Sequence, residues 1–157
     1  MELKDFSPKT ILMQIKLIYI AMLAGITFFL IVSVILSDNR SFFRAELSDP
    51  IIIALLFLTL LALPAGYLMS KRIFARIDPS VKLFEKLRIY MNGSILRLVM
   101  SEGVSLFSIV GLLITGNLFS MVFLVISLAV FTLYFPSLTR LATEINLTES
   151  EILELQR

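Results

Sequence analysis

The amino-acid sequence predicts an all-α integral membrane protein in which four transmembrane helices form two hairpins. Of its 157 residues, 58% are hydrophobic and only 17% are charged, whereas soluble domains are about 45–50% apolar and about 25% charged. The apolar residues also gather into long runs, each close to the length that a helix needs to cross a hydrocarbon core of roughly 30 Å. We therefore expect a single membrane domain over residues 1–157.

The first predicted span covers residues 17–36, which contain no charged side chain. Ser7-Pro8 is expected to start its helix, because serine is a good N-cap and proline suits the first helical position. A signal peptide would have a shorter apolar region followed by a small-residue cleavage site. We therefore interpret this helix as a retained transmembrane span.

The second predicted span covers residues 51–69 and starts at a similar pair, Asp49-Pro50. Pro64 lies within the span and is expected to kink it, because proline lacks a backbone N–H and clashes with the preceding turn. Small residues spaced four apart are typical of close helix contacts in lipid, either within one chain or between chains. Two such sets occur: Ala21 with Gly25, and Ala62, Gly66 and Ser70.

The connection to the third span is predicted to contain a short amphipathic helix over residues 80–92, lying on the inner leaflet and either separate from the third span or continuous with it. A helix-start signal occupies residues 78–80, and Phe84, Leu87 and Met91 then recur at helical spacing. Basic side chains at the membrane surface are attracted to anionic lipids. Four of them are expected to contact lipid headgroups: Lys71, Arg72, Lys82 and Lys86.

The third and fourth predicted spans cover residues 98–115 and 118–135. Gly116-Asn117 is expected to form a tight turn between them, since glycine suits the end of a helix and asparagine the start. Pro136 should end or bend the fourth span. A capping box at residues 148–151 predicts a short C-terminal helix through the end of the tail.

The distribution of Lys and Arg predicts the orientation, because cytoplasmic loops of membrane proteins are enriched in these residues. One side of the predicted spans holds only Arg40 and Arg44. The other side, which includes the N-terminus, the second connection and the tail (residues 137–157), holds the remaining twelve. Both termini are therefore expected in the cytoplasm.

Glu102 is the one acidic residue well inside a predicted span. A charged group within a bilayer costs at least about 2.5–3.5 kcal/mol on insertion scales, so such a residue is a candidate functional residue. We favour a structural role, as an interhelix hydrogen bond or an ion pair with Arg97, because Glu102 lies only about one turn beyond Leu98 and is expected near the cytoplasmic interface. Ion or ligand handling is the alternative.

Polar side chains recur every three to four residues along one side of the third span. They are Ser94, Arg97, Ser101, Ser105 and Ser108. We interpret this polar stripe as a packing surface, because serines allow helices to approach closely and to hydrogen-bond across the contact. A hydrated path or ligand groove bordered by Glu102 is the alternative.

The sequence lacks the residues that most membrane enzymes use. It has no Cys and no His, which removes thiolate nucleophiles, imidazole bases and the usual zinc ligands. It also has no paired carboxylates within a span, no HExxH motif and no phosphate-cradling glycine loop. We therefore expect no catalytic site, no metal site and no cofactor. The absence of a basic tract with interleaved aromatics also argues against nucleic acid as a partner.

Residues 86–117 resemble the third helix of a group of small bacterial four-helix membrane proteins. Residues 86–90 (KLRIY) are similar to the group's EKLxxY lead-in, residues 102–107 (EGVSLF) to its EGxxLF centre, and residues 113–117 (LITGN) to its LLTGN end. The resemblance implies the four-span layout over essentially the whole chain, in the bacterial inner (plasma) membrane, and it implies no activity. Many members have a proline after the glycine of EG. Here Val104 and Ser105 follow, so a straighter helix is expected.

A weaker resemblance links Glu102 and the apolar residues after it to the ion-carrying helix of rotary-ATPase proteolipids. The glycine-rich partner helix and the polar loop of that family are absent here. The sequence therefore predicts a non-enzymatic structural or accessory subunit that assembles by helix packing. Its expected partners are the lipid bilayer and other membrane proteins or a second copy of the chain. The alternatives are a proton- or ion-handling component that uses Glu102, and a binder of a lipid or apolar ligand between helices.

Overall fold

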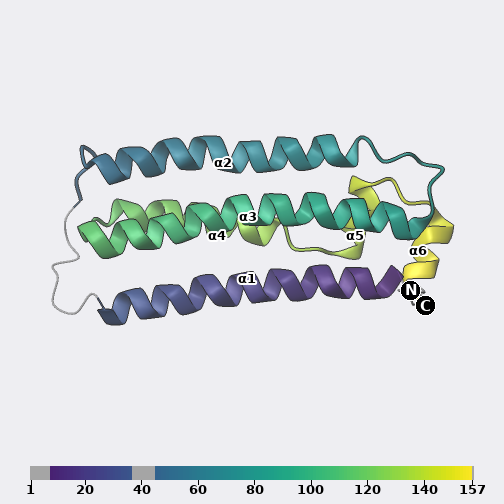
Figure 1. Ribbon diagram of the computed structural model, residues 1–157, viewed down its shortest axis with the longest axis horizontal. Coiled ribbons are helices and arrows are strands. Elements are labelled where there is room, and N and C mark those ends of the chain that lie inside the picture. Colours follow the sequence, from purple (N-terminus) through teal and green to yellow (C-terminus); the bar gives the residue numbers. More distant parts are fainter. Residues whose placement is uncertain (1–7, 37–44, 157) are drawn as a thin grey trace, which may run out of the picture.

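The computed structural model describes residues 8–36 and 45–156, and most of them are helical (Figure 1). Six helices follow one another along this part of the chain, and it contains no β-strand, which confirms the all-α prediction. The helices are α1 (Pro8–Leu36), α2 (Pro50–Phe74), α3 (Leu83–Thr115), α4 (Phe119–Leu133), α5 (Leu138–Glu144) and α6 (Glu149–Gln156).

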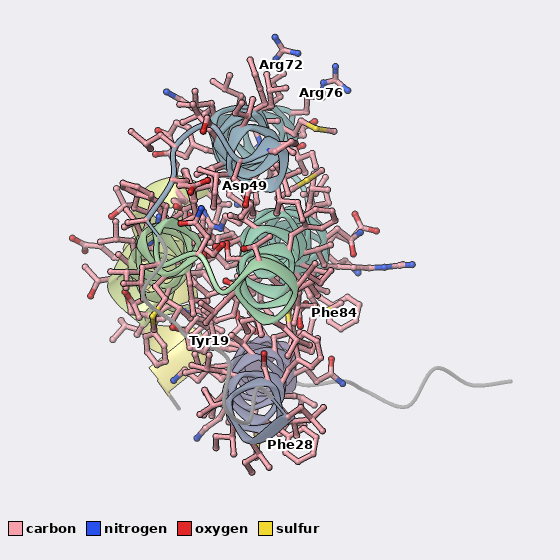
Figure 2. All side chains as sticks on the ribbon, turned by 90° about the vertical axis from the view of Figure 1, so that its left-hand side faces the viewer. Tyr19, Phe28, Asp49, Arg72, Arg76 and Phe84 are labelled. Atoms are coloured by element: carbon pink, nitrogen blue, oxygen red, sulfur yellow. The ribbon has the colours of Figure 1, made fainter. Side chains whose placement is uncertain are left out.

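Helix α3 is the centre of the bundle and packs against α1, α2 and α4. It runs between α1 and α2 in Figure 1, and the end-on view in Figure 2 shows the same order with α4 to one side. The short helices α5 and α6 gather at the end of the bundle where α1 and α3 begin and α2 ends. We call this the tail end of the bundle.

Three helices, α1, α2 and α3, are long and apolar enough to cross a membrane. The fourth predicted span is shorter, because α4 ends at Leu133 and the chain bends by 82° before α5 begins at Leu138. Pro136 lies within this break, where the sequence predicted an end or a bend. Residues 8–36 and 45–156 therefore contain three candidate membrane spans, or four if α4 and α5 form one bent span.

The outside of the bundle is apolar, as a lipid environment requires. Phe28, Leu61 and Ile114 are each more than half exposed, and Figure 2 shows Phe28 pointing away from the bundle. The buried side chains form two clusters. One lies at the tail end and includes Leu87 and Leu141, and the other includes residues of α1, α3 and α4 such as Ile109.

Several helix ends form as their residue types predict. The carboxylate of Asp49 accepts a hydrogen bond from the backbone N–H of Ile51 at 2.9 Å and caps α2. Gly116 follows α3 with a φ of 64°, a left-handed conformation that glycine adopts without steric cost. At α6, the carboxylate of Glu151 accepts a hydrogen bond from the backbone N–H of Thr148 at 2.8 Å, which completes the capping box.

The segment at residues 80–92 is not a separate helix. Asp78 accepts a hydrogen bond from the backbone N–H of Ser80 at 2.8 Å and closes a turn instead of capping a helix. The helix begins at Leu83 and continues to Thr115. The expected amphipathic segment is therefore the first part of α3, packed among the other helices rather than lying alone on a leaflet.

Pro64, α5 and the start of α1 are the remaining points at which the structure can be compared with the sequence predictions. Helix α2 continues as one helix through Pro64. In a membrane bundle, neighbouring helices and side chains can satisfy the backbone carbonyl that proline leaves without a hydrogen bond. Helix α5 was not predicted. Ser7, the expected cap of α1, lies outside the described residues, and α1 begins at Pro8.

The two sets of small residues have different surroundings. A Cβ on Gly66 would lie 3.0 Å from Cβ of Met100 and 3.4 Å from Cα of Arg97, so Gly66 allows α2 and α3 to approach closely. A Cβ on Gly25 would meet nothing within 4 Å. The Gly66 set therefore serves contacts within one chain, whereas the Gly25 set faces away from the bundle.

We expect Gly66→Ala to lower the free energy of unfolding by about 1–3 kcal/mol, the usual cost of overpacking a tight contact. Gly25→Ala is the matched control and should leave stability unchanged or slightly higher, because alanine is the better helix former. Thermal unfolding of both variants in the same detergent measures the difference. Equal stability of the two variants would contradict the close α2–α3 approach.

Candidate functional site

Two basic side chains of α3 are buried at the tail end of the bundle. Lys86 is 3% exposed and Arg97 is 2% exposed. They are eleven residues apart, which is about three helical turns, so they lie on the same side of α3. Buried charges are costly unless they are paired, and each of these cations has an acidic partner in the C-terminal segment.

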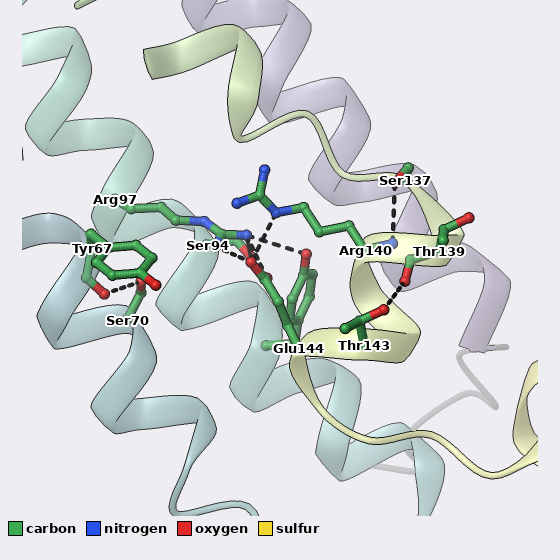
Figure 3. Close-up of polar contacts among 10 residues, drawn as sticks. Tyr67, Ser70, Ser94, Arg97, Ser137, Thr139, Arg140, Thr143 and Glu144 are labelled. Carbon is green, nitrogen blue, oxygen red and sulfur yellow. Dashed lines mark hydrogen bonds and ion pairs between the residues drawn. The ribbon is translucent and has the colours of Figure 1, made fainter.

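Arg97 forms a two-pronged ion pair with Glu144, the last residue of α5 (Figure 3). Nη1 donates to Oε1 at 2.8 Å and Nη2 donates to Oε2 at 2.9 Å. Nη2 also lies 3.2 Å from the hydroxyl of Tyr90 and 3.5 Å from that of Ser94. This parallel geometry is the strongest that a guanidinium and a carboxylate can form, and it fixes α5 against α3.

Aromatic rings surround the guanidinium of Arg97. Its central carbon lies 4.9 Å from the ring centre of Tyr134, 5.3 Å from that of Phe74 and 5.8 Å from that of Tyr90. Phe74 and Tyr90 stack on each other at 5.0 Å. A Cβ at position 93 would overlap the ring of Phe74, so Gly93 leaves the space that this ring occupies. The rings stabilise the buried cation through their π faces.

A second arginine shares the same carboxylate. Nε of Arg140 donates to Oε1 of Glu144 at 2.8 Å, one turn earlier on α5 (Figure 3). Burial alone would raise the pKa of Glu144, but the hydrogen bonds and charges of Arg97 and Arg140 outweigh it and hold that pKa below its ordinary value. Glu144 is therefore ionised at neutral pH.

Lys86 makes the second link between α3 and the C-terminal segment. Its Nζ donates to Oε1 of Glu151 at 2.7 Å. The other oxygen of Glu151 completes the capping box of α6, so this one carboxylate starts the helix and ties it to α3. Burial would raise the pKa of Glu151, but hydrogen bonds from Lys86 and Thr148 outweigh it and lower that pKa.

A cleft of about 310 Å³ opens beside Arg97, between α2 and α5. Its lining includes Tyr67, Ser70 and Lys71 of α2, and Arg97 and Glu144. Thr143 and Asn146 line its other wall. We call it the Arg97 cleft. Here a charged, deeply buried side chain meets a space large enough for a small ligand group.

The structure places the polar stripe against α4. All five of its side chains are buried. Ser101 Oγ donates to the backbone carbonyl of Ser127 at 2.8 Å, and the hydroxyls of Ser105 and Ser127 lie 2.8 Å apart. Ser108 bonds to its own helix. Ser101 and Ser105 therefore link α3 to α4, and Arg97 links α3 to α5.

Glu102 does not join this stripe. It is half-buried, and no hydrogen bond or ion pair joins its carboxylate to another described residue. The expected pair with Arg97 is wrong, because Glu144 takes both terminal nitrogens of that guanidinium. Exposed Val99, Gly103 and Phe107 lie around Glu102 on the outer side of α3.

The four residues expected at lipid headgroups fall into two groups. Lys71, Arg72 and Lys82 are exposed, and Figure 2 shows Arg72 pointing away from the bundle. Lys86 is buried and held by Glu151, so it is not a surface contact. The residues near Lys86 in the sequence indicate a basic side chain beside apolar ones. They do not indicate that Glu151, 65 residues later, binds it.

In the described residues, no group of three or more His, Cys, Asp or Glu side chains lies close enough together to hold a metal ion. Comparison with known proteins gives no lead, since no protein-family model, curated protein or solved structure matches the chain.

We expect Glu144→Gln to lower the free energy of unfolding by on the order of 3 kcal/mol at neutral pH, because it leaves a buried guanidinium without its countercharge. Glu149→Gln changes an exposed acid of the same segment and is the matched control. Chemical or thermal unfolding in detergent compares them. Equal effects of the two substitutions would contradict a stabilising role for the Arg97–Glu144 pair.

The same pair predicts a pH dependence. Because the folded-state pKa of Glu144 is lowered, its contribution is complete above the unfolded carboxyl pKa of about 4.3 and is lost as the pH falls through the lower folded-state value. The stability gap between the natural protein and Glu144→Gln should therefore close as the pH is lowered from about 5. A gap that stays constant down to strongly acidic pH would contradict this assignment.

Proposed function

We propose that this protein is a non-enzymatic accessory subunit of a bacterial inner-membrane assembly, and that it binds a partner's transmembrane helix along the outer side of α3. The observation that carries the proposal is the position of Glu102. The resemblance of residues 86–117 to a group of small bacterial four-helix membrane proteins supports the same setting.

Glu102 lies just inside the apolar part of α3, four residues after Leu98, where the third predicted span begins. It precedes Thr115, the last residue of the helix, by thirteen positions, which corresponds to about 20 Å. A carboxylate that faces the bilayer there, with no partner among the described residues, is disfavoured, by less than the roughly 2.5–3.5 kcal/mol that a charge at the centre of a span costs. A partner helix that supplies Arg, Lys or a hydrogen-bond donor would remove this cost.

The surface around Glu102 suits a close helix contact. A Cβ on the adjacent Gly103 would meet nothing within 4 Å, so the backbone of α3 is accessible there. Val99 and Phe107 are 48% and 52% exposed and flank Gly103 one turn away on each side. A small residue between two apolar residues, with a charged group beside it, has the features of a transmembrane helix interface.

Proton or ion handling by Glu102 is the second candidate function, favoured by the same unpaired carboxylate. The polar stripe does not form an internal path for a proton or ion to Glu102, because its serines are hydrogen-bonded to α4 or within their own helix. An ion would have to reach Glu102 from the outer side of α3, at the contact with a partner.

The proposed orientation places both termini in the cytoplasm. We expect a reporter fused after Gln156 to give a cytoplasmic signal and a reporter inserted within residues 40–46 to give a periplasmic one, because twelve of the fourteen Lys and Arg residues lie on the side of the termini. A periplasmic signal from the C-terminal fusion would overturn the orientation.

The subunit proposal predicts a partner that depends on Glu102. Tagged full-length protein, extracted with its surrounding lipid, should co-purify with a second membrane protein. We expect Glu102→Leu to reduce recovery of that protein at least about tenfold, which corresponds to roughly 1.4 kcal/mol of lost contact. Glu85→Gln changes an exposed acid at the start of the same helix and should leave recovery unchanged.

Three other outcomes decide between the candidates. Recovery that is equal in the Glu102→Leu and Glu85→Gln variants contradicts assembly through this surface. Recovery of only a second copy of the tagged chain identifies the assembly as self-association. If Glu102→Gln keeps the partner but abolishes proton or ion flux in reconstituted vesicles, Glu102 handles protons or ions and the purely structural role is contradicted.

A further inference from the structure

The Arg97 cleft has features that the proposed subunit role does not use. It lies at the tail end of the bundle, on a different side of α3 from Gly103, and it is lined by polar and charged groups. We propose that this cleft binds a phosphate-type anion, supplied by the headgroup of an anionic membrane lipid.

The charge balance around the cleft favours an anion. Lys71 and Arg97 line it directly, and Arg140 approaches it through Glu144. Glu144 is the one acid in this group and is held by both arginines. Three cations against one carboxylate leave a net charge of +2 beside a space of about 310 Å³. Lys71 is exposed at the cleft, so its ammonium can turn toward a ligand.

Arg97 leaves one hydrogen-bond donor unused. Its Nη1 and Nη2 atoms bind Glu144, but its Nε is buried and has no acceptor among the described residues. A buried N–H of a cation without an acceptor is costly, and most such groups are satisfied in folded proteins. Because Nε itself has no exposed surface, a ligand oxygen in the cleft would interact with the positive charge of the guanidinium and not by a direct hydrogen bond to Nε. An apolar ligand would gain nothing from this charge.

The position of the cleft along α2 matches the depth of lipid phosphates. Lys71 directly follows Met69 and Ser70, where the apolar run of the predicted span ends. Tyr67, one turn earlier, also lines the cleft and is 45% exposed. Tyrosine next to a basic residue is typical of the boundary between hydrocarbon and headgroups. A lipid whose chains lie against the apolar side of α2 would carry its phosphate to this level.

Native mass spectrometry of the full-length protein in an uncharged detergent tests the proposal. Phosphatidylglycerol and phosphatidylcholine are titrated in parallel. We expect the anionic lipid to bind more tightly, and Lys71→Gln to weaken it roughly fivefold, from about 1 kcal/mol per basic residue. Arg76→Gln is the matched control, because Arg76 is also exposed at the end of α2 but lines a different groove.

A steric variant tests the cleft without changing its charge. Ala75 is exposed and lines the cleft, so Ala75→Phe should fill part of the space and weaken phosphatidylglycerol binding while the protein stays folded. A thermal-shift titration with inorganic phosphate distinguishes the source of the anion. Stabilisation by inorganic phosphate that is lost in Lys71→Gln, without preferential lipid binding, supports the anion site but assigns it to a soluble phosphate.

Two results would overturn the proposal. One is equal weakening by Lys71→Gln and Arg76→Gln, which would mean general attraction between a basic surface and anionic lipid. The other is unchanged phosphatidylglycerol binding in Ala75→Phe, which would place the lipid outside the cleft. Thermal unfolding of each variant without added lipid or phosphate confirms that the comparison is made on folded protein.

Discussion

A guanidinium that is only 2% exposed has lost its hydration and must find its countercharge inside the protein. Arg97 meets this requirement with a carboxylate 47 residues later in the chain, and the structure of the tail end follows from it. The chain has to leave α4, bend by 82° and form α5 so that Glu144 faces α3. Lys86 and Glu151 then repeat the arrangement three turns away and hold α6. The Arg97 cleft is the space that remains between this tail and α2.

Helix α3 carries polar groups with different roles on its two sides. The side that faces α4 and α5 carries the serines and both buried cations, and nearly all of their donors and acceptors are used inside the chain. The opposite side carries Glu102 beside Gly103, with no partner in the described chain. Internal polar groups therefore hold the bundle together, whereas the outer carboxylate is available to a partner. This division is what connects the fold to the proposed role as a subunit.

Properties that depend on short stretches of sequence could be predicted, and those that depend on distant contacts could not. The apolar runs predicted the long helices, and Asp49, Gly116 and the capping box at residues 148–151 predicted helix ends that the structure confirms. Helix α5 was missed because its seven residues are too few to show a periodic pattern. Glu144 and Glu151 were missed as partners because nothing near them in sequence indicates Arg97 or Lys86. Glu102 was assigned to Arg97 from their spacing alone, and spacing along one helix could not reveal that Glu144 of another helix binds Arg97.

The central claim is that the Arg97–Glu144 pair is a coupled unit that fixes the tail against the bundle. A double-mutant cycle with Arg97→Met, Glu144→Met and the double variant, measured by unfolding in lipid bicelles, tests it most directly. Each methionine removes a charge at similar length, so the cycle isolates the interaction between the two side chains. The account predicts that the double variant is more stable than the sum of the single effects by about 2 kcal/mol or more. Single effects that add to within about 0.5 kcal/mol would contradict it.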